Sequence, residues 1–409
     1  MKPLTEPKPP QEVPIAEAIK LAAALHQNGE REDAEKLYRR ILEVEPDQPD
    51  ALNFLGVLTF QQGDAGEAIR LIRRSIEVAP DLADARNNLG NILRSQGQLE
   101  EACQEYQRAV ELDPENAGSR HNYACALTAE GRYEKALEHF LKAIDLIPQH
   151  TDAYRRAGQI LYLQGRLEEA VHLYRQWLKQ DPDHPIAAHM LAACSGVDPP
   201  PRASDDYIQR VFDTFSESFD QVLERLDYRA PELIAEAIGR EVGGPRGALQ
   251  VLDVGCGTGL CGPLLKPYAE RLVGVDLSRG MLDKARERGA HHELVQAELT
   301  AFLAGHAADY DVIVSADTLC YLGELEPVFL AAARALRPGG HFAFTVEEAD
   351  ASEVGSGFVL NPYGRYAHTA SYLEEALSAA SLGIVSMAGR EIRSESRRPV
   401  RGLVVVCSV

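Results

Sequence analysis

The first half of the chain repeats itself with a period of 34 residues. Four positions recur together: an alanine, a large apolar residue four places after it, a glycine five places before it and a proline twelve places after it. The repeated residues are Ala34, Ala68, Ala102, Ala136 and Ala170; Tyr38, Ile72, Tyr106, Phe140 and Tyr174; Gly29, Gly63, Gly97, Gly131 and Gly165; and Pro46, Pro80, Pro114, Pro148 and Pro182. Five successive copies predict a stack of one supersecondary unit, in which each copy buries its apolar face against the next.

Each repeated position has a physical reason. Glycine supplies a positive φ in the turn between two helices, and alanine lets the helices approach closely while the larger apolar residue fills the space beside it. Proline ends the second helix of each unit. With a period of 34, this pattern resembles the tetratricopeptide repeat over about residues 15–184. The resemblance implies a right-handed all-α solenoid, and residues 185–195 are expected to form one further helix that caps it, so that the solenoid spans 15–195.

The resemblance also implies a concave groove lined by the first helix of each repeat. Six polar residues are expected in that groove: Asn53, Asn87, Asn88, Asn91, Asn122 and Arg156. They could bind the backbone of an extended peptide, or they could form only a solvated polar face. The array predicts a protein or peptide partner without identifying it.

Charge and composition disfavour several classes of partner. The net charge is −20, from 42 Lys and Arg against 62 Asp and Glu, which is unsuited to binding the phosphates of nucleic acid. No apolar run approaches the roughly 18–20 residues that a membrane span needs. Residues 1–14 are polar and proline-rich, so we expect a disordered lead-in rather than a secretory signal, and a cytoplasmic location. The seven cysteines include no CxxC pair, so neither a zinc site nor a disulfide framework is predicted.

A proline-rich segment separates the two halves of the chain. Residues 196–206 (GVDPPPRASDD) are expected to be a stiff linker. Residues 207–246 are then predicted to be helical, with one apolar stripe running from Val211 to Leu226 and a second helix from Pro231. The aromatic residues of this segment could cover a ligand or could simply pack on the core: Tyr207, Phe212 and Phe215.

Short apolar runs alternate with amphipathic helices in the second half, a pattern typical of a parallel sheet with crossover helices. Seven strands are expected, at 249–254, 272–276, 292–297, 311–316, 341–346, near 384–392 and at 403–408. The predicted fold is therefore an all-α solenoid followed by a seven-stranded, Rossmann-like α/β domain over residues 247–409.

A glycine-rich turn follows the first expected strand, in the sequence LDVGCGTG. Gly255, Gly257 and Gly259 would let the backbone turn tightly against a ligand. The spacing to Gly262 also matches the dinucleotide template. The acids favour a cationic nucleoside instead, because Asp253, next to the glycines, would repel a pyrophosphate, while Asp276 at the end of the second strand can accept from ribose hydroxyls.

These motifs, together with DLSRGML (276–282) and LRPGG (336–340), resemble the class I S-adenosylmethionine-dependent methyltransferases. The resemblance implies that Asp253 and the three glycines surround the methionine moiety of S-adenosylmethionine, and that Asp276 binds its ribose. Leu277 and Met281 would flank the adenine. Four further cofactor contacts are expected after the third and fourth strands, although the family often has an aspartate where this chain has the first of them: Glu298, Leu299, Ser315 and Asp317.

Family comparison places the methyl acceptor near the ends of later strands. Tyr321 follows the fourth strand, and residues 393–402 are expected to link the last two strands. Residues 361–372 form a predicted loop that offers Tyr363, Arg365 and Tyr366 for substrate binding. Tyr321 and His368 are the catalytic candidates, although the pattern favours an ordinary histidine at a helix start or on the surface for His368. The Asn361-Pro362-Tyr363 tripeptide is interpreted as a turn, because the comparable nitrogen-methylation motif follows the fourth strand.

The sequence therefore predicts a methyltransferase whose acceptor is a protein or peptide recruited by the repeats. Three alternatives stay open. The acceptor could be a small molecule, with the repeats serving only as a scaffold. The chain could be a non-catalytic protein that binds S-adenosylmethionine, or a nicotinamide-dependent oxidoreductase, which Asp253 disfavours.

Overall fold

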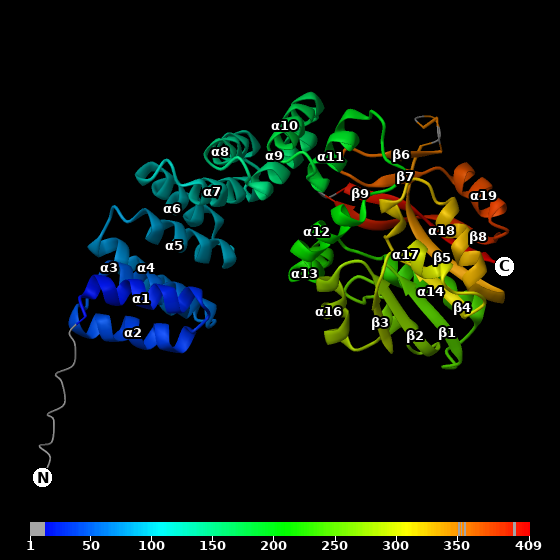
Figure 1. Cartoon of the computed structure of the whole chain (residues 1–409), viewed down its shortest axis with the longest axis horizontal. Coiled ribbons are helices and arrows are strands. Elements are labelled where there is room, and N and C mark those ends of the chain that lie inside the picture. The colour runs from blue at the N-terminus through cyan, green and yellow to red at the C-terminus, as the bar shows by residue number, and fades with distance from the viewer. Residues whose placement is uncertain (1–12, 351, 353, 356, 396–397) are drawn as a thin grey trace, which may run out of the picture. The chain divides into compact units, whose positions relative to one another are not determined.

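The structure is a computed structural model that describes residues 13–350, 352, 354–355, 357–395 and 398–409. Most of the expected lead-in, residues 1–12, lies outside the described residues. The chain divides into two compact units, Met1–Ile160 and Leu161–Val409 (Figure 1). No helix within the described ranges is both long enough and apolar enough to cross a lipid bilayer.

Eleven helices follow the 34-residue period and confirm the predicted solenoid. They are α1 (Ile15–Gln27), α2 (Arg31–Val44), α3 (Pro49–Gln61), α4 (Ala65–Val78), α5 (Ala83–Ser95), α6 (Leu99–Leu112), α7 (Ala117–Ala129), α8 (Tyr133–Leu146), α9 (Thr151–Leu163), α10 (Leu167–Gln180) and α11 (Pro185–Ser195). The five turn glycines adopt positive φ values between 73° and 99°, as their place between paired helices requires.

The repeated apolar residues form the core between these helices. All five repeated alanines have no exposed surface, and the large residues four places later are at most 1% exposed. Gly90 shows how close the packing is, because a Cβ there would lie 2.7 Å from the Cε1 atom of Tyr106. The residues that repeat in the sequence are therefore the residues that pack between the helices.

Several polar residues expected in the groove bond to one another across neighbouring repeats. Asn88 donates to Asn53 Oδ1 at 3.0 Å, and Asn122 donates to Asn87 Oδ1 at 3.0 Å. Asn53 is only 1% exposed, so its expected place on an open groove surface is wrong. The remaining two are also bonded within the array: Asn91 accepts from Tyr106 and Arg156 donates to Asp152.

Helices α10 and α11 belong to the same compact unit as the sheet, since that unit begins at Leu161. His189 of α11 bonds the Gly364 carbonyl oxygen through Nε2 at 2.9 Å. The proline-rich segment is also docked on this unit, because Pro201 O accepts from Gly323 N at 2.8 Å and Pro200 O accepts from the Tyr366 hydroxyl at 2.6 Å. The residues expected to be a stiff linker are thus fixed along the domain surface.

Three helices lead into the sheet: α12 (Asp205–Phe215), α13 (Phe219–Arg225) and α14 (Ala230–Val242). The apolar stripe from Val211 to Leu226 is therefore carried by two helices that break at residues 216–218, rather than by one. Ser204 accepts from Tyr207 N and caps α12, and Pro231 stands at the start of α14.

The sheet contains β1 (Leu249–Val254), β2 (Ala269–Asp276), β3 (Glu293–Gln296), β4 (Tyr310–Ser315), β5 (Leu336–Glu348), β6 (Phe358–Leu360), β7 (Tyr366–His368), β8 (Gly383–Glu395) and β9 (Arg398–Ser408). Strands β3, β2, β1, β4 and β5 are neighbours in that order and run parallel. Strand β9 pairs antiparallel with β5, and β8 pairs antiparallel with β9. All seven expected strands are present.

Two features differ from the seven-strand expectation. The antiparallel pair β6–β7 adds two strands, and β7 joins the end of β5 through Glu348 and His368. The predicted loop over residues 361–372 is therefore a short turn, a strand and the start of α19 (Ala370–Ala379). Strands β8 and β9 also extend into the expected 393–402 loop, since β8 runs to Glu395 and β9 begins at Arg398. Both differences arise because polar segments pair with a neighbouring strand through backbone hydrogen bonds. A polar sequence pattern does not reveal such a partner.

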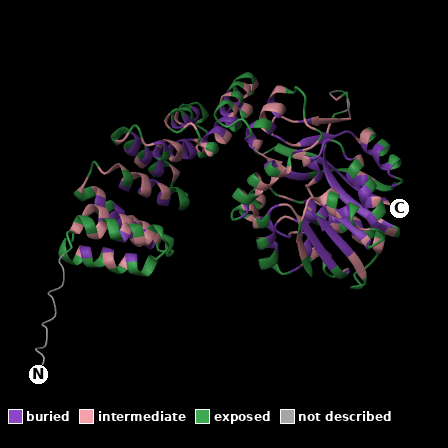
Figure 2. Ribbon diagram, in the orientation of Figure 1, coloured by how far each residue is buried: buried purple, intermediate pink, exposed green. Residues whose placement is uncertain are grey.

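Alternate residues of each central strand pack on opposite faces of the sheet. Val251 and Val312 contact α14 and α15 (Gly262–Leu265) on one face. Leu252 and Ile313 lie on the other face of the sheet. That face is covered by α17 (Leu299–Ala304), α18 (Glu326–Ala335) and α19. Figure 2 shows the resulting buried strands between more exposed helices. Coverage on both faces explains the nearly continuous apolar runs in the sequence.

Candidate active site

A glycine-rich turn leaves the carboxyl end of β1. Gly255, Gly257 and Gly259 all have positive φ, at 72°, 53° and 82°. Their backbones can adopt this turn because they lack a Cβ. The site lies at the edge where parallel strands end, the usual position of ligands in open α/β sheets.

The space beside the three glycines is occupied differently. A Cβ at Gly257 would meet nothing within 4 Å, so open space lies beside this residue. A Cβ at Gly255 would lie 2.2 Å from Thr318 Oγ1, and one at Gly259 would lie 3.2 Å from the Cβ of Ala285. Open space therefore adjoins Gly257, whereas side chains of the protein lie beside Gly255 and Gly259, and contact of the three glycines with a ligand stays a prediction.

Asp276 ends β2 beside this turn. Its Oδ2 accepts from Gly257 N at 2.9 Å and its Oδ1 accepts from Ser278 N at 2.8 Å. Burial raises the pKa of Asp276 to about 6, although the backbone donors of Ser278 and Gly257 oppose this shift. Each oxygen can accept a second hydrogen bond, so the carboxylate could still receive ribose hydroxyls.

Asp253 lies deeper than expected. Its residue is 1% exposed, and its Oδ2 lies 3.0 Å from Nε2 of His291, whose side chain has no exposed surface. The sequence did not single out His291, because two adjacent histidines, His291 and His292, immediately before a short strand carry no recognisable signal.

The residues expected near an adenine are divided between the site and the core. Met281 is 1% exposed at the start of α16 (Arg279–Arg288), whereas Leu277 and Leu299 are partly exposed. Glu298 caps α17 by accepting from Ala301 N at 2.7 Å, and it also accepts from Arg202 at 3.3 Å. Both oxygens of Glu298 thus have partners within the protein, and a cap role explains this residue without a ligand.

Helices α12 and α13 are fastened over the cofactor motifs by two aspartates. Asp213 accepts from the Ser278 hydroxyl at 2.5 Å and from Gly280 N at 3.2 Å. Asp220 accepts from the Thr258 hydroxyl at 2.5 Å. These bonds connect residues 213–220 to both the glycine-rich turn and the start of α16, which supports a covering role for this segment.

The aromatic residues considered for a cover have different surroundings. Phe212 packs edge-on against Tyr321, with ring centroids 5.4 Å apart. Tyr207 is buried beside His189, at a centroid distance of 4.0 Å, and belongs to the packing between α11 and α12. Phe215 is partly exposed.

A buried ion network lies where β4, β5 and β8 end. Arg393 donates to both oxygens of Asp317 at 2.7 Å and also contacts Glu347 and Glu395. Burial tends to raise the pKa of Glu347, but the guanidinium groups of Arg365 and Arg393 outweigh it and hold this pKa below its usual range. Asp317 has a φ of 53°, which is uncommon for a residue other than glycine and marks a constrained position.

The other residues expected after β4 differ in accessibility. Ser315 is fully buried and donates to Val254 O at 3.1 Å, so it links β4 to β1. Tyr321, in the short helix η1 (Leu319–Tyr321), is partly exposed. Burial raises the pKa of its hydroxyl well above the usual range, so Tyr321 is protonated at neutral pH.

The proposed acceptor loop is held between the last repeat and the sheet. Tyr363 donates to Glu347 Oε2 at 2.7 Å, and its ring meets that of Tyr162 edge-on at 5.8 Å. Arg365 donates to Glu347 at 2.6 Å. Tyr366 has no exposed surface, so its expected contact with substrate is wrong in this arrangement.

His368 is part of the protein interior. It has no exposed surface, and its Nε2 lies 3.0 Å from Gly323 O. Burial lowers its pKa to about 4. A side chain enclosed on every side cannot exchange a proton with an acceptor, so the structure gives no support for His368 as a base. The residue precedes Thr369, the cap of α19, but it is buried and not at the surface.

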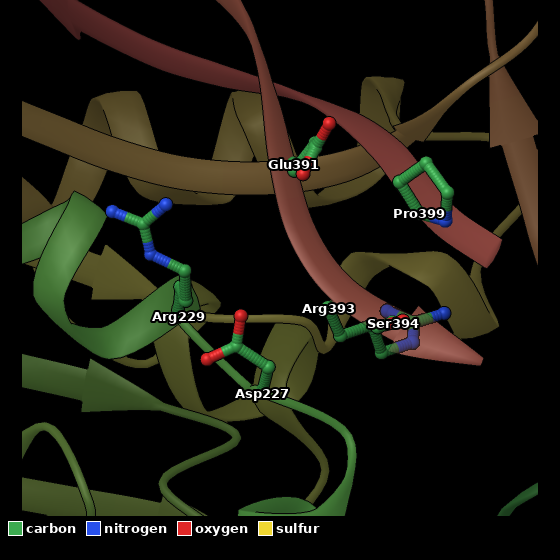
Figure 3. A pocket seen from close by; sticks show the side chains of 6 residues that line it. All are labelled: Asp227, Arg229, Glu391, Arg393, Ser394 and Pro399. Atoms are coloured by element: carbon green, nitrogen blue, oxygen red, sulfur yellow. The ribbon is translucent and has the colours of Figure 1, made fainter. Parts of the chain in front are cut away.

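A pocket of about 340 Å³ lies along β8 (Figure 3). It is lined by Asp227, Arg229, Glu391, Arg393, Ser394 and Pro399. Backbone bonds from Arg229 N to Ile392 O and from Ser394 N to Leu226 O attach the 226–229 segment to β8. None of the lining residues belongs to the glycine-rich turn, so this pocket is not the cofactor site.

Sequence reasoning missed Arg393, Glu347, Asp213 and Asp220. Glu347 could have been found from its position at the carboxyl end of a predicted parallel strand. The other three side chains reach the site only after chain segments far apart in sequence pack together. Among the described residues, no group of three or more His, Cys, Asp or Glu side chains is arranged to hold a metal ion.

Comparisons with known proteins agree with both halves of this architecture. Residues 252–344 match the family described as "Methyltransferase domain", and residues 19–81, 81–149 and 127–194 match families described as "Tetratricopeptide repeat". The ubiquinone biosynthesis O-methyltransferase of Thiobacillus denitrificans is 30% identical over 135 residues, which cover 30% of this chain and 57% of that protein. The malonyl-[acyl-carrier protein] O-methyltransferase of Serratia marcescens is 31% identical over 110 residues, covering 27% and 43%.

The chain therefore spans only about half the length of these relatives. Among solved structures, an S-adenosylmethionine-dependent methyltransferase from Mesorhizobium loti is 24% identical, with a TM-score of 0.35 and coverage of 43% of this chain and 98% of that chain. MamA is 22% identical, with a TM-score of 0.36 and coverage of 39% and 94%. The chain therefore combines tetratricopeptide repeats, matched over residues 19–194, with a methyltransferase domain, matched over residues 252–344.

Proposed function

We propose that this chain transfers a methyl group from S-adenosylmethionine to an acceptor. The observation that carries the proposal is the pairing of open space beside Gly257 with the carboxylate of Asp276, which stands at the end of the adjacent strand. A compact turn without side chains and a neighbouring acid suit a ligand that carries ribose hydroxyls. Leu277 would contribute apolar surface beside the base.

The protein's own contribution to transfer is binding, orientation and exclusion of water. The donor supplies an activated methyl group on a sulfonium, so positioning of the acceptor can provide much of the acceleration. Helices α12 and α13, fastened by Asp213 and Asp220, would limit access of water. Asp317 and Tyr321 lie after β4, where they would contact the acceptor side of the site.

Calorimetry with S-adenosylmethionine and S-adenosylhomocysteine tests this proposal. The wild-type chain should bind both, and Asp276→Ala should weaken binding at least tenfold. Asp283→Ala is the matched control, because Asp283 lies on α16 and pairs only with the exposed Arg286. Binding of NADH without any affinity for S-adenosylhomocysteine would instead favour the oxidoreductase alternative.

For the acceptor, we propose a protein or peptide that the repeat array recruits. The support is the array itself, since tetratricopeptide repeats typically bind proteins. A second candidate is a small molecule, favoured by the names of relatives that methylate oxygen during ubiquinone biosynthesis. The malonyl-[acyl-carrier protein] enzyme is intermediate, because its name places the acceptor on a carrier protein.

Transfer of labelled methyl groups to cell lysate separates the two candidates. Label in protein supports a recruited acceptor, and label only in metabolites supports a small molecule. Deleting all the repeats would be a poor test, because α11 packs on the domain through Ala193 against Leu360 and Tyr366. Full-length Asn88→Ala/Asn122→Ala is preferable: it should reduce methylation of a recruited protein and leave that of a free metabolite unchanged.

A further inference from the structure

His291 occupies a closed space beneath the glycine-rich turn. It lies between α16 and β3, and none of its side-chain surface is exposed. Its Nε2 is 3.0 Å from Oδ2 of Asp253, a residue 38 positions earlier at the end of β1. Since a carboxylate can only accept, the imidazole Nε2–H donates to Asp253.

Three glycines create the room that this imidazole fills. A Cβ at Gly262 would lie 2.9 Å from His291 Cε1, and a Cβ at Gly274 would lie 2.8 Å from His291 Cδ2. A Cβ at Gly259 would lie 3.3 Å from His291 Cε1. These contacts join the glycine-rich turn, the next helix and β2 around one side chain. They also explain why residue 262 is a glycine without a bound dinucleotide, since a Cβ there would collide with His291.

The pair leaves one carboxylate oxygen unused. Asp253 Oδ1 is buried and has no hydrogen-bond partner among the described residues, and the same is true of His291 Nδ1. A buried carboxylate oxygen without a donor is costly, so a specific unsatisfied atom of this kind calls for an explanation. Asp253 lies two residues before Gly255, the first of the three positive-φ glycines, and open space lies beside the second, Gly257. A cationic hydrogen-bond donor on a bound ligand would supply the partner that Asp253 Oδ1 lacks.

We propose that His291 is a positioning residue for cofactor binding. It holds Oδ2 of Asp253 so that Oδ1 is oriented to receive the ammonium group of the cofactor's methionine moiety. This inference rests on the proposed function, because it assumes that S-adenosylmethionine binds at the turn. It separates two roles: Asp276 recognises the nucleoside, and the Asp253–His291 pair recognises the amino acid.

Two probes distinguish positioning from a general structural effect. S-adenosylhomocysteine carries the ammonium group, and 5′-methylthioadenosine lacks the whole amino acid moiety. By calorimetry on full-length protein, Asp253→Asn and His291→Ala should each weaken S-adenosylhomocysteine binding at least tenfold. Both variants should bind 5′-methylthioadenosine within about twofold of wild type. His291→Gln, which keeps an N–H donor near the Nε2 position, should retain most of the affinity for S-adenosylhomocysteine.

The double variant Asp253→Asn/His291→Ala provides a second measure. If His291 acts through Asp253, the double variant should be no weaker than Asp253→Asn alone. His292→Gln is the matched control, because its ring accepts from Leu272 N at 2.9 Å and does not contact Asp253. Should His291→Ala not fold, the comparison of Asp253→Asn with His291→Gln on the two probes still decides the question.

Equal weakening of both probes in the Asp253 and His291 variants, or no weakening of either, would overturn the positioning role. Failure of the wild-type chain to bind either probe is a different outcome. It would overturn the proposed methyltransferase function together with this inference.

Discussion

Arg393 donates to both carboxylate oxygens of Asp317 at 2.7 Å, joining the end of β8 to the turn after β4 across 76 positions of sequence. The same guanidinium contacts Glu347 at the end of β5. Arg393 is 4% exposed and Glu347 is 2% exposed. A buried charge network thus joins β5 and β8 to the turn after β4, on the side where we propose that the acceptor binds.

Arg393→Ala should destabilise the chain strongly. The substitution leaves the carboxylates of Asp317 and Glu347 without their shared partner, and loss of one member of a buried ion pair typically costs about 3–5 kcal/mol. Urea denaturation should show this loss in the free energy of unfolding of the second compact unit. The exposed Arg390, on the same strand, is the control, and its change to alanine should alter stability by less than about 0.5 kcal/mol. Equal stability of the two variants would contradict a structural role for the network.

Affinity for S-adenosylhomocysteine should fall as the pH is lowered through about 6, because burial raises the pKa of Asp276 to about 6. The ionised carboxylate accepts hydrogen bonds from ribose hydroxyls better than the protonated acid does. At pH 5 the affinity should be about tenfold below its value at pH 7, if only the ionised form binds. Calorimetry at several pH values checks this.

The same shift has the opposite effect on the stability of the chain without cofactor. Because the folded chain holds the Asp276 proton more tightly than the unfolded chain does, this group's contribution to stability decreases as pH rises from about 4 to 6. The variant Asp276→Asn tests the binding prediction, because it should remove the part of the pH dependence of S-adenosylhomocysteine affinity that arises from this carboxylate. If the affinity of the variant still depends steeply on pH, the dependence arises from another group.

Release of the covering segment should speed dissociation of the cofactor. Asp213→Asn and Asp220→Asn each weaken a charge-assisted hydrogen bond between residues 213–220 and the cofactor motifs. We expect a several-fold faster dissociation of S-adenosylhomocysteine and faster hydrogen exchange in α12 and α13. Stopped-flow fluorescence and exchange mass spectrometry measure these effects. Asp206→Asn, an exposed position on the same helix, should leave both quantities unchanged.

The repeat array should lose stability as pH rises from about 6.5 to 9. His121 of α7 lies 3.1 Å from Asp152 of α9. Burial lowers the pKa of His121, but bonds to Asp152 and Cys125 outweigh it and raise this pKa to about 9. The stabilisation is therefore fully present below pH 6.5 and is lost through pH 9, at a cost on the order of 1–3 kcal/mol.

Thermal unfolding followed by circular dichroism at several pH values measures that loss. His121→Gln should flatten the dependence, whereas substitution of the exposed His172 should not. An unchanged slope in His121→Gln would show that the alkaline loss arises elsewhere.

The repeats and the positions of the strands along the chain could be predicted from the sequence because both depend on local periodicity. A glycine, an alanine and a large apolar residue recur every 34 positions, since each copy must pack on a similar neighbour. The strand that ends at Val254 and the strand that ends at Asp276 were likewise evident, because each apolar run carries an acid at its end and is followed by turn residues. These features involve residues close together in the chain.

Tertiary structure alone decided what surrounds those residues. His291 contacts Asp253, and Arg393 contacts Asp317, only after crossover connections place distant strands side by side; no local pattern encodes either contact. Tyr366 and His368 appear polar and accessible in sequence, yet pairing of β7 with β5 and packing against α11 bury them. The sequence by itself determined the architecture and the position of the glycine-rich turn, because periodic burial specifies secondary structure. Packing between elements far apart in the chain determined which polar groups remain available to a ligand.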